Sequence, residues 1–454
     1  MSQILEKDRR EHTQTARILS GKALMLLTAC AVLTMTTGVF GETRVGDSAA
    51  PIDVIDREDL ELSGLQSADD ILKTMVADGK VSLNIRGRAE IADQDGFETS
   101  QAYTVRTRLG FTSGEYNGFL AHIEVLDVRS ADESLYNAAG LNDEPDKTVI
   151  ADPEDTRLNQ FYANYDFEDF DGSVRVGRQR IILDDARFVG NVGWRQIEQT
   201  FDAVRLNFMP HEQIEGTYAY IWDVNRIFGP DADRDYESDS HIINLSYDDS
   251  RIGKITGFGY LLDFDDESTA AANSSNTYGV RYEATRPLKG DIEGPKIKYV
   301  FSYATQSDTG DNSDNYDAHY YLADVKYISE SGCYVGGGWE LLGSDDGMAA
   351  FRTPLATGHA FNGWADVFLT TPDDGLEDTY IYIGGNLPDG YKGKVVYHWF
   401  DPDEGSRDFG EELDAVVSKK ISENMDLLAK YAYYNGDAAF ADRARFWLQL
   451  TLNY

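Results

Sequence analysis

Arginine recurs at alternate positions in two neighbouring segments near the start of the β-rich part of the chain. One segment contains Arg86 and Arg88, and the next contains Arg106 and Arg108. A guanidinium offers a planar fork of donors that fits a carboxylate or a phosphate. Four of them on one face of a strand pair therefore predict either an anion-binding surface or a ladder of internal ion pairs.

Further basic residues follow the same pattern along the chain. We expect them to point inward, away from lipid, as do Lys298, Lys326 and Lys430. The alternative is that they pair with acidic neighbours such as Glu90 and Glu124, because a polar interior needs its charges balanced. The candidate pore-lining residues are Arg86, Arg88, Arg106, Arg108, Arg175, Arg178, Arg180, Arg187, Arg195, Arg205 and Arg281.

The elements that must position these side chains are β-strands. From Val81 onward, apolar and polar residues alternate in short segments separated by Gly, Asp and Asn, with the period of 2 that a pleated strand imposes. An arginine turned toward lipid costs roughly 2–4 kcal/mol near the bilayer midplane, so the arginine face must be the inner one. The predicted strands are 81–91, 102–112, 118–128, 158–167, 173–182, 201–208, 214–223, 241–247, 254–262, 277–285, 296–306, 319–328, 333–342, 379–386, 393–400, 412–420, 425–434 and 444–454.

Loop lengths separate into two classes along the chain. Short connections such as 112–118 and 168–172 alternate with long acidic ones such as 129–157 and 343–378. Short turns at one end and long loops at the other are typical of a membrane barrel and not of a soluble sandwich. The predicted fold is all-β: a transmembrane antiparallel β-barrel of about 18 strands, with short periplasmic turns and long acidic extracellular loops.

The final segment, 444–454, fits a lipid-facing strand with an aromatic residue at its end. Phe446, Leu448, Leu450 and Leu452 fall on one face, and Tyr454 follows them as the expected mark for barrel assembly. We expect this strand to pair with the first one and so close the barrel.

The N-terminal region has a separate organisation. Residues 1–41 combine a basic start with one apolar run and predict a secretory signal peptide, whereas an anchoring helix is the alternative. Lipid attachment at Cys30 is disfavoured because apolar residues continue beyond it. Residues 42–80 predict a periplasmic segment with a short helix capped at Ser67, in preference to a receptor plug. Residues 81–454 then form the barrel.

Composition excludes several functional classes. The net charge of -38 makes nucleic acid an unlikely partner. The seven His are scattered, no phosphate-cradling Gly-rich loop occurs, and no Cys/His cluster suggests a metal site, so we expect no cofactor, no metal and no catalytic residues. Asp231, Asp233 and Asp235 begin a calcium-like run but lack its turn glycine and final glutamate, so bound calcium stays an open alternative.

One stretch of the chain resembles a known family. Residues 177–201 read GRQRIILDDARFVGNVGWRQIEQTF, which is similar to the signature of the alginate-export porin family, and 354–372 (PLATGHAFNGWADVFLTTP) agrees with it. The resemblance implies a monomeric outer-membrane barrel whose lumen carries basic residues for an anionic polysaccharide. The motif residues are Gly177, Arg178, Arg180, Arg187, Asn191, Gly193, Trp194 and Arg195.

The sequence as a whole therefore predicts a Gram-negative outer-membrane porin that passes anionic saccharides or an alginate-like polyuronate without chemistry. A general porin for small anions or oligosaccharides is the alternative, and an outer-membrane enzyme is a remote one. The expected partners are outer-membrane lipid and lipopolysaccharide, the anionic saccharide, and periplasmic proteins.

Overall fold

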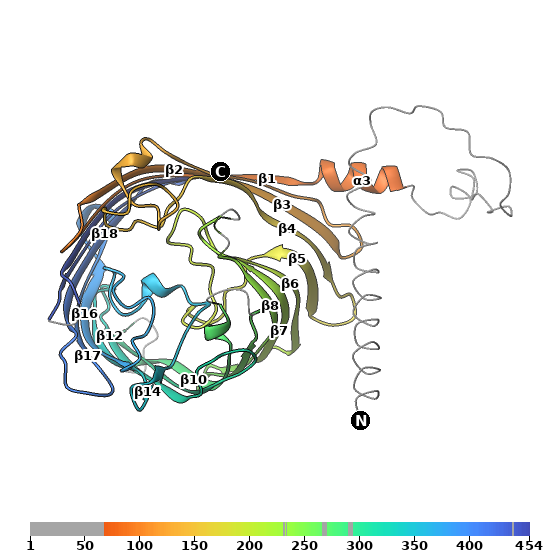
Figure 1. Ribbon diagram of the computed structural model, residues 1–454. Coiled ribbons are helices and arrows are strands. Elements are labelled where there is room, and N and C mark those ends of the chain that lie inside the picture. The colour runs from red at the N-terminus through yellow and green to blue at the C-terminus, as the bar shows by residue number, and fades with distance from the viewer. Residues whose placement is uncertain (1–67, 230–231, 233, 266–269, 289–293, 438–439) are drawn as a thin grey trace, which may run out of the picture. The chain divides into compact units, whose positions relative to one another are not determined.

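The computed structural model describes residues 68–229, 232, 234–265, 270–288, 294–437 and 440–454. Within these residues, eighteen antiparallel strands form one sheet that closes on itself (Figure 1). All eighteen strands expected from the sequence are present, so the predicted fold is confirmed. The predicted signal peptide and the proposed cap at Ser67 lie outside the described residues.

The bounds of the elements agree closely with the alternation in the sequence. The barrel strands are β1 (Lys80–Gln94), β2 (Ser100–Thr112), β3 (Phe119–Ser130), β4 (Asp155–Asp166), β5 (Gly172–Gln179), β6 (Thr200–His211), β7 (Ile214–Asn225), β8 (Tyr236–Asp249), β9 (Gly253–Leu262), β10 (Ser275–Pro287), β11 (Lys296–Asp308), β12 (Asp317–Ile328), β13 (Tyr334–Leu342), β16 (Leu376–Asn386), β17 (Tyr391–Asp401), β18 (Gly410–Ser422), β19 (Met425–Asn435) and β20 (Arg443–Asn453). The other elements are the helix α3 (Ala68–Ala77), the short pair β14 (Ser344–Asp345) and β15 (Ala349–Ala350), and the 3-10 turns η1 (Glu133–Leu135), η3 (Ala271–Asn273), η4 (Gly358–Ala360) and η5 (Pro388–Gly390).

The two faces of each strand differ in the way the sequence predicts. In β2, Val105 and Leu109 keep 47% and 54% of their surface exposed on the outside, whereas Arg106 between them is fully buried inside. A membrane barrel must turn its apolar residues outward to lipid and its polar residues inward. The inner face of this barrel is therefore the place to look for a solute site.

The first and last barrel strands close the sheet. β1 pairs with β20 in antiparallel register, with Asn84 opposite Asn453 and Gln94 opposite Arg443. Of the four leucine and phenylalanine side chains expected on the lipid side of β20, Phe446 is typical, with 40% of its surface exposed. The predicted seam is confirmed.

The short connections gather at one end of the barrel, where the helix α3 leads into β1. The Met75 carbonyl of this helix accepts a hydrogen bond from the Gly114 N–H in the turn between β2 and β3. In the described part of the chain, no helix is long and apolar enough to span a bilayer.

Two segments depart from the sequence prediction. β5 ends at Gln179, three residues before the predicted end, because the chain turns inward there. The 343–375 connection contains the β14–β15 pair, which sequence periodicity did not indicate. Apolar residues of this connection, including Phe351 and Leu355, lie in the largest buried cluster, inside the ring of strands.

Candidate functional site

Two long loops fold into the barrel and meet there (Figure 1). One spans residues 180–199 between β5 and β6, and the other spans 343–375 between β13 and β16. The Gly190 N–H donates to the Leu355 carbonyl at 2.9 Å, and the Gln199 side chain donates to the same carbonyl at 3.3 Å. We call the two joined loops, 180–199 and 343–375, the loop plug.

Two predicted arginines of β1 hold the plug against the barrel wall. The Arg86 guanidinium donates to the carbonyls of Gly193, Trp194 and Arg195 at 3.1–3.2 Å. Arg88 donates to the Trp194 carbonyl at 2.6 Å and lies 4.4 Å from the centre of its ring. Loop carbonyls removed from water need such donors, so these arginines have a structural task.

Glu198 is the centre of a second attachment. Its carboxylate accepts from Arg108 at 2.9 Å, from Arg180 at 2.8 Å and from Asn191 at 2.8 Å. Burial alone would raise the pKa of this carboxyl, but the hydrogen bonds and charges of Arg180 and Arg108 lower it to about 2. The group is therefore ionised at neutral pH and fixes the start and end of the 180–199 loop.

A third group joins both halves of the plug to the seam strands. Arg195 lies 3.3 Å from Glu90 of β1 and 2.7 Å from Asp366 of the 343–375 loop. Arg445 of β20 lies 3.0 Å from the same Glu90. All four side chains are almost fully buried, and buried charges persist in proteins when they are paired in this way.

The opposite wall is connected by two more of the predicted residues. Arg187 lies 2.7 Å from Glu340 of β13 and donates to Asn362 of the plug at 2.9 Å. Arg281 of β10 lies 2.9 Å from Asp185 of the plug. The plug is thus fastened around the barrel rather than along one side.

Arg106 differs from its neighbours. Its guanidinium donates to Asn84 at 2.7 Å, but its Nε and Nη1 atoms have no hydrogen-bond partner among the described residues. The nearby charge is also positive, since Arg86 is its direct cross-strand partner. Among the predicted arginines, Arg106 therefore has the largest number of buried guanidinium nitrogens without a hydrogen-bond acceptor in the described residues.

The remaining predicted residues stay on the barrel wall. Arg178 makes a two-pronged pair with Asp202 at 2.8 and 2.9 Å, while Arg175 and Arg205 bond to asparagines of the same wall. The ion-pair alternative therefore describes most of the eleven arginines, and their contact with a solute stays a prediction.

The two stretches that carry the family resemblance meet at His359. The His359 ring stacks on Trp194 with centroids 4.5 Å apart, its Nδ1 lies 2.7 Å from Asp366, and its Nε2 lies 2.7 Å from the Lys430 ammonium. A neutral ring that donates from Nδ1 and accepts at Nε2 satisfies both neighbours. Burial, together with the charges of Lys430 and Arg195, lowers the pKa of His359 to about 3. Sequence periodicity indicated the inward position of Lys430 but not its partner His359.

A cavity of about 560 Å³ lies on one side of the plug, among residues of the long loops. We call it the arginine pocket. Asp366 is the one carboxylate among its described lining residues, and burial lowers the pKa of its loop residue Arg226 to about 10. Its arginines are Arg195, Arg226, Arg234, Arg352, Arg443 and Arg445. Only Arg195 was among the predicted site residues. Alternation in the last strand placed Arg445 on the inner face, but the other four arginines occupy loops or a strand end where alternation carries no signal.

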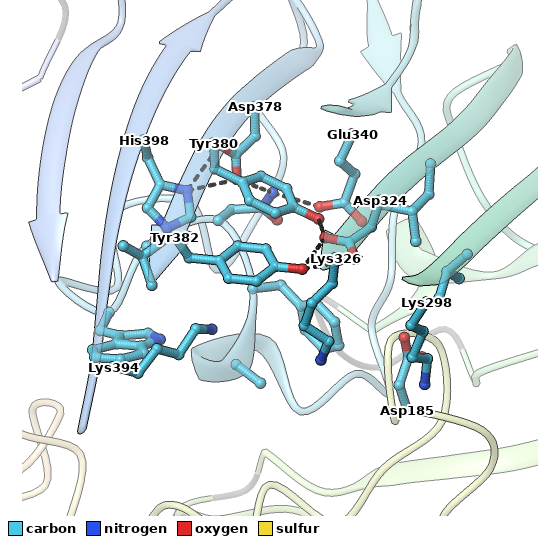
Figure 2. Close-up of a pocket in the computed structure, with 18 of the residues that line it drawn as sticks. Asp185, Lys298, Asp324, Lys326, Glu340, Asp378, Tyr380, Tyr382, Lys394 and His398 are labelled. Carbon is cyan, nitrogen blue, oxygen red and sulfur yellow. Dashed lines mark hydrogen bonds and ion pairs between the residues drawn. The ribbon is translucent and has the colours of Figure 1, made fainter. Parts of the chain in front are cut away.

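A second cavity, of about 310 Å³, is lined by strands β10 to β17 and by the plug, and we call it the tyrosine pocket (Figure 2). Its principal side chains are Tyr334, Tyr380, Tyr382, Lys298, Lys326, Lys394 and Arg281. The plug residues Gly358 and His359 line the arginine pocket, whereas the following residues, 360–364, line the tyrosine pocket. This segment therefore stands between the two cavities. Of the ammonium groups, Lys298 and Lys326 were expected to point inward from the sequence.

The described residues contain no group of three or more His, Cys, Asp or Glu arranged to hold a metal ion. Asp231 and Asp233 of the calcium-like run lie outside the described residues. The site therefore rests on guanidinium, ammonium and tyrosine groups.

Known structures with the same fold come from outer-membrane proteins. Pseudomonas aeruginosa OpdK with vanillate superposes with a TM-score of 0.65 and 11% identity, over 84% of this chain and 99% of that one. Acinetobacter baumannii OccAB2 gives a TM-score of 0.63 and 15% identity, over 84% and 99%. Pseudomonas aeruginosa OccK9 (OpdG) gives 0.64 and 14%, over 84% and 100%. At this identity the likeness concerns the fold.

Sequence comparison identifies the family. No curated protein sequence matches the chain. The model of the family described as alginate export matches residues 79–334, which is more than half of the chain and includes β1 to β12 and the 180–199 loop. The chain therefore belongs to the alginate export family and forms an outer-membrane channel.

Proposed function

We propose that this channel passes anionic saccharides and that the arginine pocket selects them by charge. The observation that carries the proposal is the lining of this pocket, which has six guanidinium groups and one carboxylate in a chain whose net charge is -38. Arg195, Arg352 and Arg445 are paired with acidic residues, so the excess positive charge comes from Arg226, Arg234 and Arg443, which have no ion pair among the described residues. A lining that followed the overall composition of the chain would contain more acidic than basic residues. A cavity with one sign of charge and a low-dielectric wall concentrates ions of the other sign.

The lowered pKa of Arg226 supports the same proposal. Its guanidinium is largely buried and lies 4.4 Å over the ring of Tyr236, so burial disfavours its charge. An incoming carboxylate would offer this group the bidentate partner that guanidinium geometry favours. The folded protein already carries the cost of removing the Arg226 guanidinium from water. Binding of an anion at this guanidinium would offset that cost.

A bilayer experiment tests the proposal. The reversal potential of the reconstituted protein in a salt gradient should show preference for anions, and an oligouronate should reduce the current. The Arg226→Gln/Arg234→Gln double variant should lose much of both effects because it removes two of the six lining charges. Arg129→Gln is the control, since Arg129 is an exposed arginine at the end of β3 and does not line the pocket. Cation preference in the unmodified protein would refute the proposal.

Uptake of small anions is the second candidate function, and one observation favours it. The plug leaves cavities of about 310 and 560 Å³, within the range of about 300–1,000 Å³ typical of small-molecule sites. Passage of a polymer needs the plug to move, whereas a monosaccharide needs less room. Liposome swelling with uronates of increasing length separates the two candidates. A small-anion channel would admit only the shortest uronates, so swelling would cease beyond a few sugar units.

A further inference from the structure

Two tyrosines of β16 lie flat against the barrel wall. Tyr382 is the cross-strand partner of Gly336, and Tyr380 is the partner of Gly338. A Cβ atom built on Gly336 would lie 2.6 Å from the far end of the Tyr382 ring, and one on Gly338 would meet the Tyr380 ring as closely. Each ring therefore extends sideways over the neighbouring strand, where only glycine leaves room for it. In this orientation the ring turns a face, and not an edge, toward the lumen.

The same two rings are fixed in position. The Tyr382 hydroxyl donates to Asp324 at 2.9 Å, and the Tyr380 hydroxyl donates to Asp324 at 3.3 Å. Their centroids are 6.1 Å apart and their planes differ by 24°. Figure 2 shows the two rings extending side by side from one strand toward Asp324. They form a preorganised aromatic platform on the wall of the tyrosine pocket.

One ammonium group lies over a ring of this platform, and a second lies over Tyr334 in the same pocket. Lys394 Nζ lies 5.2 Å from the centre of the Tyr382 ring, and Lys326 Nζ lies 5.2 Å from the centre of the Tyr334 ring. Among the described residues, no carboxylate oxygen lies within 4.0 Å of either ammonium, whereas Lys298 in the same pocket has Glu283 at 3.5 Å. The pocket thus holds two cations without a direct acidic partner in the described part of the chain.

The acidic residues of the pocket complete its chemistry. Asp324 accepts from two tyrosines, and Asp378 accepts from His398 at 2.9 Å and from Asn362 at 3.2 Å. A carboxylate has about four acceptor positions, so the partly exposed Asp324 retains capacity for further donors, whereas Asp378 is almost fully buried. Hydroxyl groups of a sugar are donors of this kind, and an aromatic acid has few of them.

We propose that the tyrosine pocket is a separate binding subsite for one sugar-acid ring, a pyranose that carries a carboxylate. The C–H face of the pyranose packs on the Tyr380 and Tyr382 rings, whose faces carry negative electrostatic potential. Lys326 and Lys394 neutralise the carboxylate, and Asp324 accepts from the ring hydroxyls. The arginine pocket selects by charge, while this subsite recognises the ring together with the charge. The subsite rests on the proposed function in one respect, that acidic saccharides reach the lumen.

Ligand comparison on the unmodified protein tests the subsite. In detergent solution, ligand-observed NMR titration would measure the binding of D-glucuronate, D-glucose, acetate and 4-hydroxybenzoate. We expect glucuronate to bind about tenfold more tightly than glucose, because the ammonium groups act on its charge, and more tightly than acetate, because the platform acts on its ring. Equal binding of glucuronate and glucose, or of glucuronate and acetate, would overturn the proposal. So would tighter binding of 4-hydroxybenzoate, which would assign the pocket to aromatic acids.

Variants locate the binding. Lys326→Met/Lys394→Met should weaken glucuronate binding about tenfold and leave glucose binding unchanged. Tyr382→Leu should weaken both sugars. Resistance of the barrel to unfolding in SDS without heating confirms that each variant is folded. If the lysine variant binds glucuronate as the unmodified protein does, the subsite is not where we place it.

The control separates this proposal from the charge selection by the arginine pocket. Arg226→Gln/Arg234→Gln should alter the reversal potential and weaken the binding of acetate and glucuronate alike, whereas Lys326→Met/Lys394→Met should reduce the preference for glucuronate over acetate. Loss of the preference for glucuronate over acetate in the arginine variant would assign recognition of the ring to the arginine pocket and overturn the subsite. Cation preference of the unmodified channel would instead refute the proposed function and leave the binding comparison to be judged by itself.

Discussion

At the scale of single residues, the inner arginines divide by what they bind. Arg86 and Arg88 satisfy loop carbonyls, Arg108 and Arg180 neutralise Glu198, and Arg106 leaves two of its donor atoms without a partner among the described residues. Deleting one member of a buried charge group costs more than the group contributes as a whole, because it strands the other members. The residue that binds the largest number of partners should therefore be the most sensitive to substitution.

Glu198→Gln tests this expectation. The substitution leaves the guanidinium groups of Arg108 and Arg180 without their shared carboxylate, and we expect it to lower the free energy of unfolding by about 3–5 kcal/mol. Urea unfolding of the protein in lipid vesicles measures the change. Glu168→Gln, in the exposed turn between β4 and β5, is the matched control and should have almost no effect. Equal effects of the two would show that the Glu198 cluster adds no stability.

His359 gives a prediction for pH dependence. Its pKa is lowered to about 3 in the folded protein, against about 6.5 in an unfolded chain, and the charges that face it are Asp366, Lys430 and Arg195. Between these values the unfolded chain binds a proton that the folded one does not. Stability from this group is therefore complete above about pH 6.5 and falls by at most about 1.4 kcal/mol per unit as pH decreases toward 3.

Comparison with His359→Gln isolates this contribution from that of other titrating groups. The advantage in unfolding free energy of the unmodified protein over the variant should be smaller at pH 4.5 than at pH 7. An advantage that does not change with pH would contradict the inferred neutral state of the ring.

At the scale of elements, the strands could be predicted from the sequence, and the length of the loop after β5 indicated that it could fold inward, but the partners of that loop could not be predicted. A strand such as β10 carries its own signal, since Tyr278 and Val280 point outward to lipid and Arg281, which follows them, points inward. The position of a loop is decided by partners far away in the chain, as when Arg187 finds Glu340. The sequence therefore identified the inward arginines without indicating which of them the plug would engage.

The glycines of the tyrosine pocket did leave a signal that alternation does not capture. Gly336 and Gly338 occupy alternate positions of β13, which is the same face, and Tyr380 and Tyr382 repeat the spacing in β16. A pairing of alternate glycines with alternate tyrosines indicates rings laid across the next strand. Recognising it requires the register between strands that only the structure provides.

Mobility of the plug leads to a prediction at this scale. Val189 and Leu355 are bridge partners between the two loops, so cysteines at these positions lie within the range of a disulfide. In a background with Cys30 and Cys333 replaced by serine, oxidation should leave small-ion conductance and abolish the passage of oligouronates in liposome swelling. Dithiothreitol should restore it. The Val189→Cys single variant is the control, and unaltered swelling after oxidation would show that solutes pass without separation of the loops.

Gly336→Val gives a second prediction for an element. The added side chain would displace the Tyr382 ring from β13, and overpacking of this kind typically costs about 1–3 kcal/mol. Gly257→Val in β9 is matched to it, because a Cβ atom there meets nothing within 4 Å. Urea midpoints in vesicles should fall for the first variant and stay constant for the second. A fall of equal size in both variants would contradict the inference that the Tyr382 ring lies against Gly336.

At the scale of the whole molecule, the lining of the arginine pocket is basic although the chain as a whole is acidic. The chain carries -38, whereas arginines outnumber carboxylates in the lining of the arginine pocket. Acidic loops act on an approaching anion over a long distance, and guanidinium groups act at contact. Salt screens the long-range repulsion beyond about 8 Å at physiological ionic strength and weakens the contact less.

The association rate of an oligouronate should therefore rise with ionic strength, contrary to the usual behaviour of an anion site. Current fluctuations in a planar bilayer at about 0.05 and 0.5 M salt measure this rate. A neutral oligosaccharide of the same length should show no such trend. An association rate that falls with salt would mean that long-range attraction by the arginine pocket outweighs long-range repulsion by the acidic loops.

The seam between β1 and β20 has a consequence for how the protein comes into being. The Leu83 N–H donates to the Tyr454 carbonyl at 2.9 Å, and the Tyr454 N–H donates to the Leu83 carbonyl at 2.8 Å, so the strands farthest apart in the sequence complete each other. A chain without β20 would present open edges on β1 and β19, and in lipid each unpaired backbone group costs several kcal/mol. A fragment that stops before residue 443 should therefore insert into lipid vesicles poorly, because the backbone groups at the edges of β1 and β19 would lack their partners in β20.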